Sequence, residues 1–437
     1  MSFWQNAQTL YGLPEREDST ITLGNTDGLP YEFFNIDVPD HWPDRRNPMY
    51  GSIPYIMGLQ QSHVASLLWV NSAHTYINIL DYTYQSLDGK MTRWVSEAGA
   101  MEFLIFGKIG DDRVAQNSLD IATITGFPAM PPIPWLGYNF CKWANVSADI
   151  MIERNRNFTE NNYQVDVLWM DVQWAQQYSI PDAVEFFLFN PLNFTTEGLA
   201  EMNTQIEAAK RRITLIIDPH VKVTDSYYLY HDGMEMQKDY VAGNVTNIFV
   251  RYPNATSWDE LVNFEGQCWP GLSVWFDFLN ENAQTYWGQQ YAYDNFNGST
   301  HIYQVWNDMN EPQIYDTPTK TMPVEMIHFK TDGRAFEHKV LHNAYGAFHQ
   351  RSSYRGLLAR DNNMKRPFVL TRSFFMGSQK FGAYWSGDNY SISSELHGCV
   401  NQLLGVSIAG HPFGGCDVPG FKSEQDDDVP PTDDLFI

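Results

Sequence analysis

The chain has 437 residues, which exceeds one ordinary domain and is enough to bury a large core. Its 28 lysines and arginines against 52 aspartates and glutamates give a net charge of −24, which argues against nucleic acid and anionic lipid as partners because their phosphates would be repelled. Aromatic residues make up 15% of the chain, a content that suits stacking on sugar rings and equally suits a large core.

The cysteine content and the hydropathy pattern argue against several further classes. Four cysteines are too few and too scattered for a disulfide framework or a zinc site, and only Cys399 and Cys416 are candidates for a pair. No apolar run approaches the roughly 20 residues needed to span a bilayer, so no membrane span is expected. The amino terminus shows no secretory signal, and the residues alone do not indicate a compartment.

Residues 1–128 are predicted to be all-β. Short runs rich in Ile, Val, Phe, Tyr and Trp are separated by Gly, Pro and Asn, which is the pattern of short strands and turns. These runs are Tyr31–Ile36, Ile53–Met57, Ser66–Val70, Tyr76–Leu80 and Glu102–Phe106.

A proline-rich joint at residues 126–134 separates this region from a different pattern. Beyond it, apolar strand-like runs alternate with amphipathic stretches at helical spacing, such as Glu197–Arg211 and Glu337–Ala359. This alternation predicts repeated βα units and a parallel sheet over residues 129–421. Residues 422–437 are acidic, proline-containing and aperiodic, which predicts a disordered tail.

The ends of the predicted strands carry charged residues. Apolar runs lead into Asp171, Asp218, Asp308, Arg372, Asp388 and Asp417, the last of them from the run Gly405–Gly415. Any one of these charges could merely cap the loop that follows its strand. Taken together they favour a (β/α)8 barrel, because the carboxyl ends of its parallel strands converge on one mouth.

These charged residues limit the classes of reaction that the chain could catalyse. The sequence has no Gly-rich phosphate loop, no Gly-x-Ser-x-Gly elbow and no ordered ligand spacing, so no cofactor and no metal are predicted. Glycoside hydrolysis fits better, because one ionised carboxylate can attack the anomeric carbon while a protonated carboxyl serves the leaving oxygen. Arg372 beside Asp308 would keep that carboxylate ionised, whereas the aromatic neighbours of Asp388 would raise its pKa by desolvation.

The segment Val305–Pro312, VWNDMNEP, resembles the signature of glycoside hydrolase family 31, the retaining α-glucosidases. The segments Arg366–Gly382 and Tyr384–Asn389 resemble the arginine and acid/base segments of the family. Five shorter segments resemble the glucosidase II type within the family, and the resemblance thereby covers nearly the whole chain. They are Tyr11–Glu15, Phe34–Val38, Tyr50–Tyr55, Ile217–Val223 and Gln267–Gly271.

The resemblance implies two catalytic residues. Asp308 stands at the position of the family's nucleophile, and Asp388 stands at the position of its general acid/base. Glu311 is the alternative partner of Asp308, but neighbours on one turn project in similar directions, whereas the catalytic pair must flank the scissile bond. Glu311 is therefore interpreted as a supporting residue, and His220 as a strand-end support and not a metal ligand.

The resemblance assigns five further residues to the substrate. Asp171 and Arg372 stand where the family binds the hydroxyls of the terminal glucose. Asp37 matches an aspartate on a loop of the β domain that reaches toward the substrate. Trp269 and Trp306 are expected to wall the sugar pocket, with core packing as an equal alternative for both.

The resemblance also implies parts that this sequence lacks. Family members continue with an eighth barrel strand, bearing a histidine that binds the same glucose, and then with further β domains. The expected fold is an incomplete (β/α)8 TIM barrel at residues 129–421, lacking its eighth strand, after part of an antiparallel β-sandwich domain at residues 1–128. Such a barrel would expose two unpaired sheet edges, which predicts a poorly stable chain.

The predicted function is that of a retaining exo-α-glucosidase. By resemblance to the glucosidase II type, it would remove α-1,3-linked glucose from N-linked glycans in the lumen of the endoplasmic reticulum, together with a regulatory subunit that retains it there. Two alternatives stay open: another α-glucosidase of the family that acts on starch-like sugars, and a truncated, non-catalytic sugar-binding fragment.

Overall fold

The computed structural model describes residues 1–38, 46–176, 184–238, 246–253 and 262–423. The chain divides into two units, each built from separate stretches of sequence. The first unit comprises Met1–Ala129, His338–Ala347 and Thr371–Ile437, and the second comprises Met130–Glu337 and Phe348–Leu370. Except for its first two residues, the predicted acidic tail lies outside the described part of the chain.

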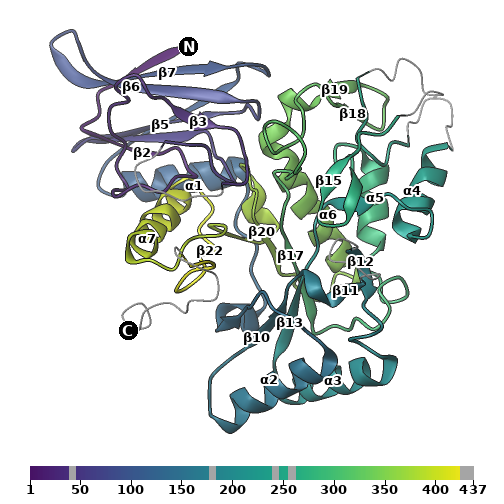
Figure 1. Cartoon of the computed structure of the whole chain (residues 1–437). Helices are drawn as coiled ribbons and strands as arrows, with labels where there is room; N and C mark the ends of the chain where they lie inside the picture. Colours follow the sequence, from purple (N-terminus) through teal and green to yellow (C-terminus); the bar gives the residue numbers. More distant parts are fainter. Residues whose placement is uncertain (39–45, 177–183, 239–245, 254–261, 424–437) are drawn as a thin grey trace. The chain divides into compact units, whose positions relative to one another are not determined.

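The first unit contains two four-stranded antiparallel sheets, which Figure 1 shows in purple and blue. One sheet has the strand order β1-β7-β6-β3 and the other the order β2-β4-β5-β8. The strands are β1 Ser2–Gln5, β2 Thr9–Gly12, β3 Tyr31–Phe33, β4 Tyr55–Leu59, β5 His63–Trp69, β6 Thr75–Tyr84, β7 Leu87–Ser96 and β8 Phe103–Ile109. Each predicted run overlaps one of these strands, whereas β1, β2 and β7 were missed.

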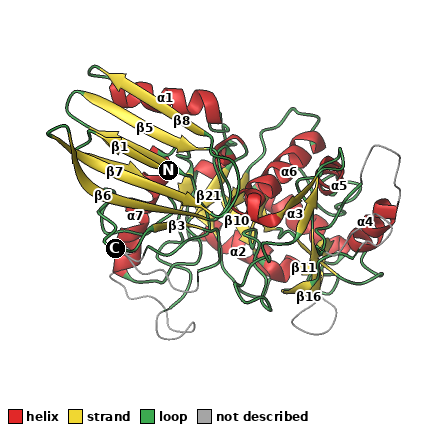
Figure 2. Ribbon diagram, turned by 90° about the horizontal axis from the view of Figure 1, so that it is seen from above, coloured by secondary structure: helices red, strands yellow, loops and turns green. Residues whose placement is uncertain are grey.

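Strands β4 and β5 are covered on both faces. One face meets the other sheet in a core that includes Leu10, Ile56 and Trp94. The opposite face packs against helices α1 (Arg113–Thr125) and α7 (Ser393–Ile408), and Figure 2 shows α1 beside β8. Four of the five residues of β4 are therefore buried, and the strand lacks the alternation of a half-buried sheet.

Helix α1 corrects the prediction that residues 1–128 are all-β. Its sequence is rich in Ile and Thr, which favour strands. The two side chains that it buries, Asn117 and Ile121, are four residues apart and share one helix face. Asn117 donates to the Tyr55 hydroxyl at 2.8 Å and accepts from the Ser66 hydroxyl at 2.7 Å. These partners come from β4 and β5, so tertiary contacts hold the helix against the sheet.

The second unit contains the predicted parallel strands. Strands β9, β10, β13, β17 and β20 are neighbours in that order, and the pairs β9–β10, β10–β13 and β13–β17 are parallel. Their bounds are β9 Asn139–Phe140, β10 Val167–Met170, β13 Arg212–Ile216, β17 Tyr303–Asn307 and β20 Val369–Thr371. Chain order and spatial order agree, as expected for successive βα units of a barrel.

Helices separate these strands along the chain, and α2 and α3 pack side by side near β10 and β13 (Figure 1). They are α2 Ala148–Glu160, α3 Thr196–Ala208, α4 Tyr228–Lys238, α5 Glu281–Gln289 and α6 Tyr345–Arg360. The predicted helix from Glu337 begins later, at Tyr345, because two short 3-10 turns, His338–Val340 and His342–Ala344, precede it. Further 3-10 turns are Ile133–Leu136, Val172–Trp174 and Ser378–Lys380.

Small antiparallel sheets lie in the segments that connect the parallel strands of the second unit. They pair β11 with β12, β14 and β15 with β16, and β18 with β19. Their bounds are β11 Ala175–Gln176, β12 Glu185–Phe189, β14 His220–Lys222, β15 Gly266–Cys268, β16 Gly271–Trp275, β18 Ile327–Phe329 and β19 Ala335–Glu337.

The carboxyl-terminal part of the first unit holds a further parallel pair, β21 (Ala383–Trp385) and β22 (Gly414–Gly415), connected by α7. The expectation of a strand-like run at Gly405–Gly415 was wrong for its first residues, because α7 continues to Ile408. Cys399 and Cys416, the candidate pair in the sequence, form a disulfide that joins α7 to the residue after β22. Within the described residues, no helix combines the length and the apolar content that crossing a bilayer requires.

Candidate active site

Two of the predicted aspartates stand at strand ends in the second unit. Asp171 follows β10 and Asp308 follows β17, with β13 between the two strands. Because the three strands are parallel, both aspartates lie at the same edge of the sheet. Asp171 is 8% exposed and Asp308 is 9% exposed, so protein surrounds both almost completely.

The backbone beside each of these aspartates holds its carboxylate. Oδ1 of Asp171 accepts from the N–H of Val172, and Oδ1 of Asp308 accepts from the N–H of Met309, both at 2.7 Å. Met309 has a φ of 55°, a left-handed conformation that costs a residue with a side chain about 1–2 kcal/mol. The strand and the next residue therefore both contribute to the direction of each carboxylate.

Glu311 and His220 have the surroundings of supporting residues. Glu311 is fully buried, whereas Asp308 keeps some exposed surface. His220 is buried in β14 with its Nε2 3.4 Å from a carboxylate oxygen of Asp218, and burial lowers the pKa of His220 to about 3. The imidazole is therefore neutral at physiological pH. Across the described ranges, no group of three or more His, Cys, Asp or Glu side chains is arranged to hold a metal ion.

The two predicted tryptophans differ in their surroundings. Trp306 on β17 is 7% exposed and packs against Trp169 on β10, with ring centroids 5.5 Å apart. Trp269 is only partly buried, on the turn between β15 and β16. Its ring meets those of Trp143 and Tyr315 edge to face, at centroid distances of 6.1 and 5.8 Å. Because Trp143 is half exposed, the Trp269 cluster reaches solvent, whereas Trp306 has a core environment.

Three predicted residues come together in the first unit. Arg372, which is 1% exposed, follows β20 and presents its guanidinium to two aspartates. Its Nη2 lies 3.7 Å from Oδ2 of Asp37, and its Nη1 lies 3.9 Å from Oδ2 of Asp388. The side chains of Asp37 and Asp388 are 24% and 29% exposed. Within its own unit, Arg372 is therefore the neighbour of the predicted acid/base.

The environment of Asp388 raises its pKa above the usual value of an aspartate. Burial is the largest cause, and the charge of Asp37 acts in the same direction, whereas Arg372 and Lys422 lower the pKa. The pKa of Asp388 is therefore shifted upward, as expected from the sequence. A carboxyl that keeps its proton toward neutral pH can act as a general acid.

Tyr50 and Gly387 were missed as contributors to this site. Tyr50 is fully buried and contacts both Arg372 and the backbone of Asp388, and Gly387 directly precedes Asp388. Neither residue carries a charge, so neither is found by looking in the sequence for charged residues at the ends of strands. The only available signals were the motif Tyr50–Tyr55 and the glycine next to the proposed acid.

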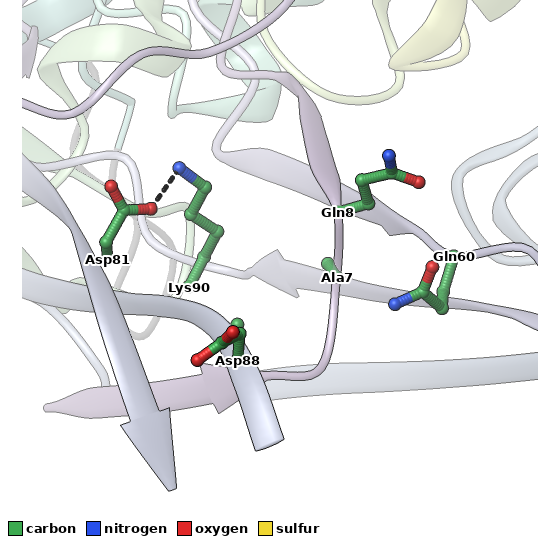
Figure 3. A pocket seen from close by; sticks show the side chains of 7 residues that line it. Ala7, Gln8, Gln60, Asp81, Asp88 and Lys90 are labelled. Atoms are coloured by element: carbon green, nitrogen blue, oxygen red, sulfur yellow. Dashed lines mark hydrogen bonds and ion pairs between the residues drawn. The ribbon is translucent and has the colours of Figure 1, made fainter. Parts of the chain in front are cut away.

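A separate polar cavity of about 310 Å³ lies on the sheets of the first unit (Figure 3). Within it, Lys90 forms an ion pair with Asp81. The lining residues are Ala7, Gln8, Gln60, Asp81, Asp88, Gly89 and Lys90. None of the predicted site residues belongs to this lining, so the cavity has no part in the predicted chemistry.

Two protein-family models match the chain. Residues 128–436 match the glycosyl hydrolases family 31 TIM-barrel domain. Residues 4–78 match the glycosyl hydrolase 31 N-terminal galactose mutarotase-like domain. The first match covers more than half of the chain and includes Asp171, Asp308, Arg372 and Asp388.

Known proteins resemble the chain over most of its length. Neutral alpha-glucosidase C of Mus musculus is 32% identical over 428 residues, which cover 94% of this chain and 44% of that protein. A structure of the glucosidase II alpha subunit, in an alpha3-Glc2-bound form, has a TM-score of 0.85 at 31% identity and covers 99% of this chain and 45% of that one. A complex of the ER glucosidase II catalytic subunit with the binding domain of its regulatory subunit gives a TM-score of 0.84 at 31% identity, covering 96% and 44%. The chain thus spans less than half the length of these relatives.

Proposed function

The chain belongs to glycoside hydrolase family 31, and on that premise we propose that it acts as a retaining α-glucosidase on terminal α-linked glucose. The family and the barrel-type fold that the sequence predicted are confirmed by the match over residues 128–436. The observation that carries the proposed activity is the environment of Asp388. This carboxyl lies 3.9 Å from the buried Arg372, and burial raises its pKa.

In the proposed first step, Asp308 attacks the anomeric carbon as a carboxylate while Asp388 transfers its proton to the glycosidic oxygen. The bond between that carbon and that oxygen breaks, the glucose becomes covalently attached to Asp308, and the remainder of the substrate leaves with the proton. The raised pKa of Asp388 supports its role because the acid must start protonated. The position of Asp308 directly after the fully buried strand β17 supports its role, because misplacement by one ångström costs about a hundredfold in rate.

In the proposed second step, Asp388 acts as a base. It takes a proton from a water molecule, whose oxygen attacks the anomeric carbon and displaces Asp308. Glucose leaves with the α configuration because the same carbon has been inverted twice. Asp308 is again a carboxylate and Asp388 is again protonated, so both residues return to their starting states.

We assign Asp37, Asp171 and Arg372 to the hydroxyls of the terminal glucose. Sugar hydroxyls both donate and accept hydrogen bonds, so they suit a set that combines carboxylate acceptors with a guanidinium donor. We also assign Trp269 and Trp306 to the walls of the sugar pocket. The assignment has more support for Trp269, because its aromatic cluster includes the half-exposed Trp143.

We propose α-1,3-linked glucose of N-linked glycans as the substrate. Support comes from the glucosidase II alpha subunit, which was solved in an alpha3-Glc2-bound form and is 31% identical to this chain. The alternative is a starch-like α-1,4 linkage. Comparing kcat/KM for nigerose and maltose, the α-1,3 and α-1,4 disaccharides of glucose, separates the two, and preference for maltose would favour the alternative.

We further propose that the chain works in the lumen of the endoplasmic reticulum together with a regulatory subunit. The solved ER glucosidase II complex, which contains the binding domain of such a subunit, supports both points. The Cys399–Cys416 disulfide supports an oxidising compartment. Cell fractionation and co-purification of a second subunit test these proposals. The division into a β domain at 1–128, a barrel at 129–421 and an acidic tail at 422–437 stays a prediction.

Asp308→Ala tests the proposed activity directly. With an aryl α-glucoside as substrate, we expect the variant to lose at least about 10⁴-fold in kcat, because no nucleophile is left. Asp332→Ala, which removes an exposed aspartate paired with Arg334, is the matched control and should keep full activity. Proton NMR of the first-formed glucose should show the α anomer.

Equal rates for the original chain and Asp308→Ala would contradict the proposed activity. That result would favour the alternative of a non-catalytic fragment, which would bind glucose without turning over any glycoside. Calorimetric titration with glucose then distinguishes a sugar-binding fragment from an inert one.

A further inference from the structure

We propose that Tyr50 is the positioning residue that holds the Asp388 backbone, the Asp37 backbone and the Arg372 guanidinium in one arrangement. The proposal rests on the proposed function, since it takes Asp388 as the general acid/base. All the contacts that carry it lie within the first unit.

The Tyr50 hydroxyl fixes the segment that carries Asp37. The side chain is fully buried and packs with Ile36, Val38 and Met49. Its hydroxyl donates to the carbonyl oxygen of Val38 at 3.1 Å. Because Val38 directly follows Asp37, this hydrogen bond restrains the backbone from which the Asp37 carboxylate projects.

The same hydroxyl oxygen contacts the proposed acid/base. It accepts a hydrogen bond from the backbone N–H of Asp388 at 3.4 Å. A phenol has one proton, and because that proton points to Val38, the oxygen serves as the acceptor for the Asp388 amide. One atom therefore links the backbones at Asp37 and Asp388, which are far apart in sequence.

The ring of Tyr50 lies against the Arg372 guanidinium. The central guanidinium carbon lies 4.9 Å from the ring centroid, which is a cation–π contact. In this position Nη2 faces Asp37 at 3.7 Å and Nη1 faces Asp388 at 3.9 Å. The aromatic ring therefore contacts the same group that faces both carboxylates.

The residue before Asp388 is a glycine, which leaves room for the Tyr50 ring. Gly387 has a φ of 78°, and a Cβ at this position would lie 2.1 Å from Cε2 of Tyr50. Only glycine permits both the left-handed backbone and the close approach. Beyond Asp388, the N–H of Tyr390 donates to Oε2 of Glu395, so the segment Gly387–Tyr390 is held at both ends.

The inferred role is to position Asp388, and Tyr50 transfers no proton to substrate. Burial raises the pKa of Tyr50 well above its ordinary value, and the charges of Asp37 and Asp388 act in the same direction, whereas Arg372 lowers it. The hydroxyl therefore keeps its proton while Asp388 titrates. Loss of the hydroxyl should let Asp388 move toward water, which would lower the pKa of its carboxyl.

Tyr50→Phe tests the inference because it removes the hydroxyl and keeps the ring under Arg372. For an unactivated disaccharide, we expect kcat to fall about 10- to 100-fold while KM changes by less than about threefold. The alkaline limb of the pH–rate profile should move to lower pH. Tyr55→Phe is the matched control, because Tyr55 is also buried and its hydroxyl accepts from Asn117 at 2.8 Å; its pH profile should not move.

Hydrogen exchange of the peptide that contains Asp388 gives a readout independent of turnover. We expect exchange at least about tenfold faster in Tyr50→Phe and unchanged in Tyr55→Phe. Unchanged exchange in Tyr50→Phe would overturn the inference, as would faster exchange with the original pH profile, which would leave Tyr50 only a structural role. If the original chain hydrolyses nothing, the proposed function fails, and the exchange rates still decide whether Tyr50 holds the segment.

Gly387→Ala is the second variant, in case Tyr50→Phe does not fold. It disturbs the same contact from the opposite side, because the added methyl group must displace the Tyr50 ring. We expect the same faster exchange and the same shift of the alkaline limb. Slow exchange together with the original pH profile in a folded Gly387→Ala protein would overturn the inference.

Discussion

The two units hold their carboxylates in different ways. In the second unit, Asp171 and Asp308 stand at the ends of parallel strands, and the N–H of the following residue fixes each one at 2.7 Å. In the first unit, Asp37 and Asp388 come from distant segments and share contacts with Arg372 and Tyr50. At the strand ends the adjacent backbone contributes to holding each carboxylate, whereas the two loop carboxylates of the first unit share contacts with side chains from elsewhere in the chain.

The hydrogen bonds of nearby asparagines also differ between the two units. In the second unit, Asn307 donates to the carbonyl oxygen of Ile217 at 2.9 Å and supports the β17–β13 pairing that already exists. In the first unit, the fully buried Asn35 donates to Ser373 Oγ at 2.9 Å and to the Asn343 carbonyl oxygen at 3.0 Å. These bonds join the segments of Asp37 and Arg372. The geometry of the first unit should therefore be the more sensitive to substitutions outside the charged residues.

Removing Asp388 should produce the largest of the effects on the first unit. In Asp388→Ala we expect the rate on an unactivated disaccharide to fall about 10²- to 10⁴-fold, because its leaving group needs a proton. Aryl α-glucosides with activated leaving groups should lose far less in the glycosylation step, measured as kcat/KM. Similar losses on both substrate types would argue against the acid/base assignment.

The pH dependence of the rate also tests the assignment of Asp388 as the general acid. Because the pKa of Asp388 is raised, its acid form is present below that pKa and is lost as the pH rises through it. Hydrolysis of the disaccharide by the original chain should therefore decline on the alkaline side. That alkaline limb should disappear in Asp388→Ala, whereas a limb that persists would belong to another group.

Asn35→Ala tests whether the first unit depends on distant contacts. The substitution removes the side-chain donor to Ser373 Oγ and to the carbonyl oxygens of Asn343 and Phe374, and we expect a loss of about 2–4 kcal/mol in the free energy of unfolding and a lower kcat. Ser147→Ala is the matched local substitution. Ser147 caps α2 by accepting from the N–H of Ile150 at 3.2 Å, so its loss should cost about 1 kcal/mol and leave kcat unchanged.

Urea unfolding and steady-state kinetics of the two variants measure this difference. Equal losses of stability, or a kcat reduced as much by Ser147→Ala as by Asn35→Ala, would remove the distinction between locally and distantly fixed residues.

Glu17→Gln should have the smallest effect on activity, because it changes only how the stability of the fold depends on pH. Glu17 is 3% exposed and lies against Gly398 of α7, and burial followed by the charge of Glu395 raises the pKa of Glu17 to about 8. The ordinary pKa of a glutamate is 4.5, so between pH 4.5 and pH 8 the folded chain holds a proton that the unfolded chain has released. The contribution of Glu17 to the free energy of unfolding is therefore largest below pH 4.5 and declines as the pH rises toward 8.

The variant removes this proton linkage. Between pH 5 and pH 8, we expect the unfolding free energy of Glu17→Gln to decline less than that of the original chain, by about 3 kcal/mol. Unfolding in urea at several pH values measures the difference. Glu102→Gln, at an exposed position, is the control and should leave the pH dependence unchanged. The same slope in Glu17→Gln as in the original chain would show that Glu17 is ionised in the folded state.

Sequence alone determined the features that depend on neighbouring residues. The apolar runs before Asp171 and Asp308 predicted strands β10 and β17, and both aspartates lie directly beyond those strands. The family was readable from the segment Val305–Pro312 and its companions, and the match over residues 128–436 confirms it. These features were predictable because strand formation and short motifs depend on residues that are adjacent in the chain.

Only the tertiary structure decided the features that depend on distant residues. Residues 113–125 form a helix whose buried Asn117 finds its partners on β4 and β5. The uncharged Tyr50 contacts Arg372 and the Asp388 amide only after the chain has folded. The physical reason is that a contact between distant residues exists only once the intervening chain is ordered, and no short pattern specifies how the chain closes.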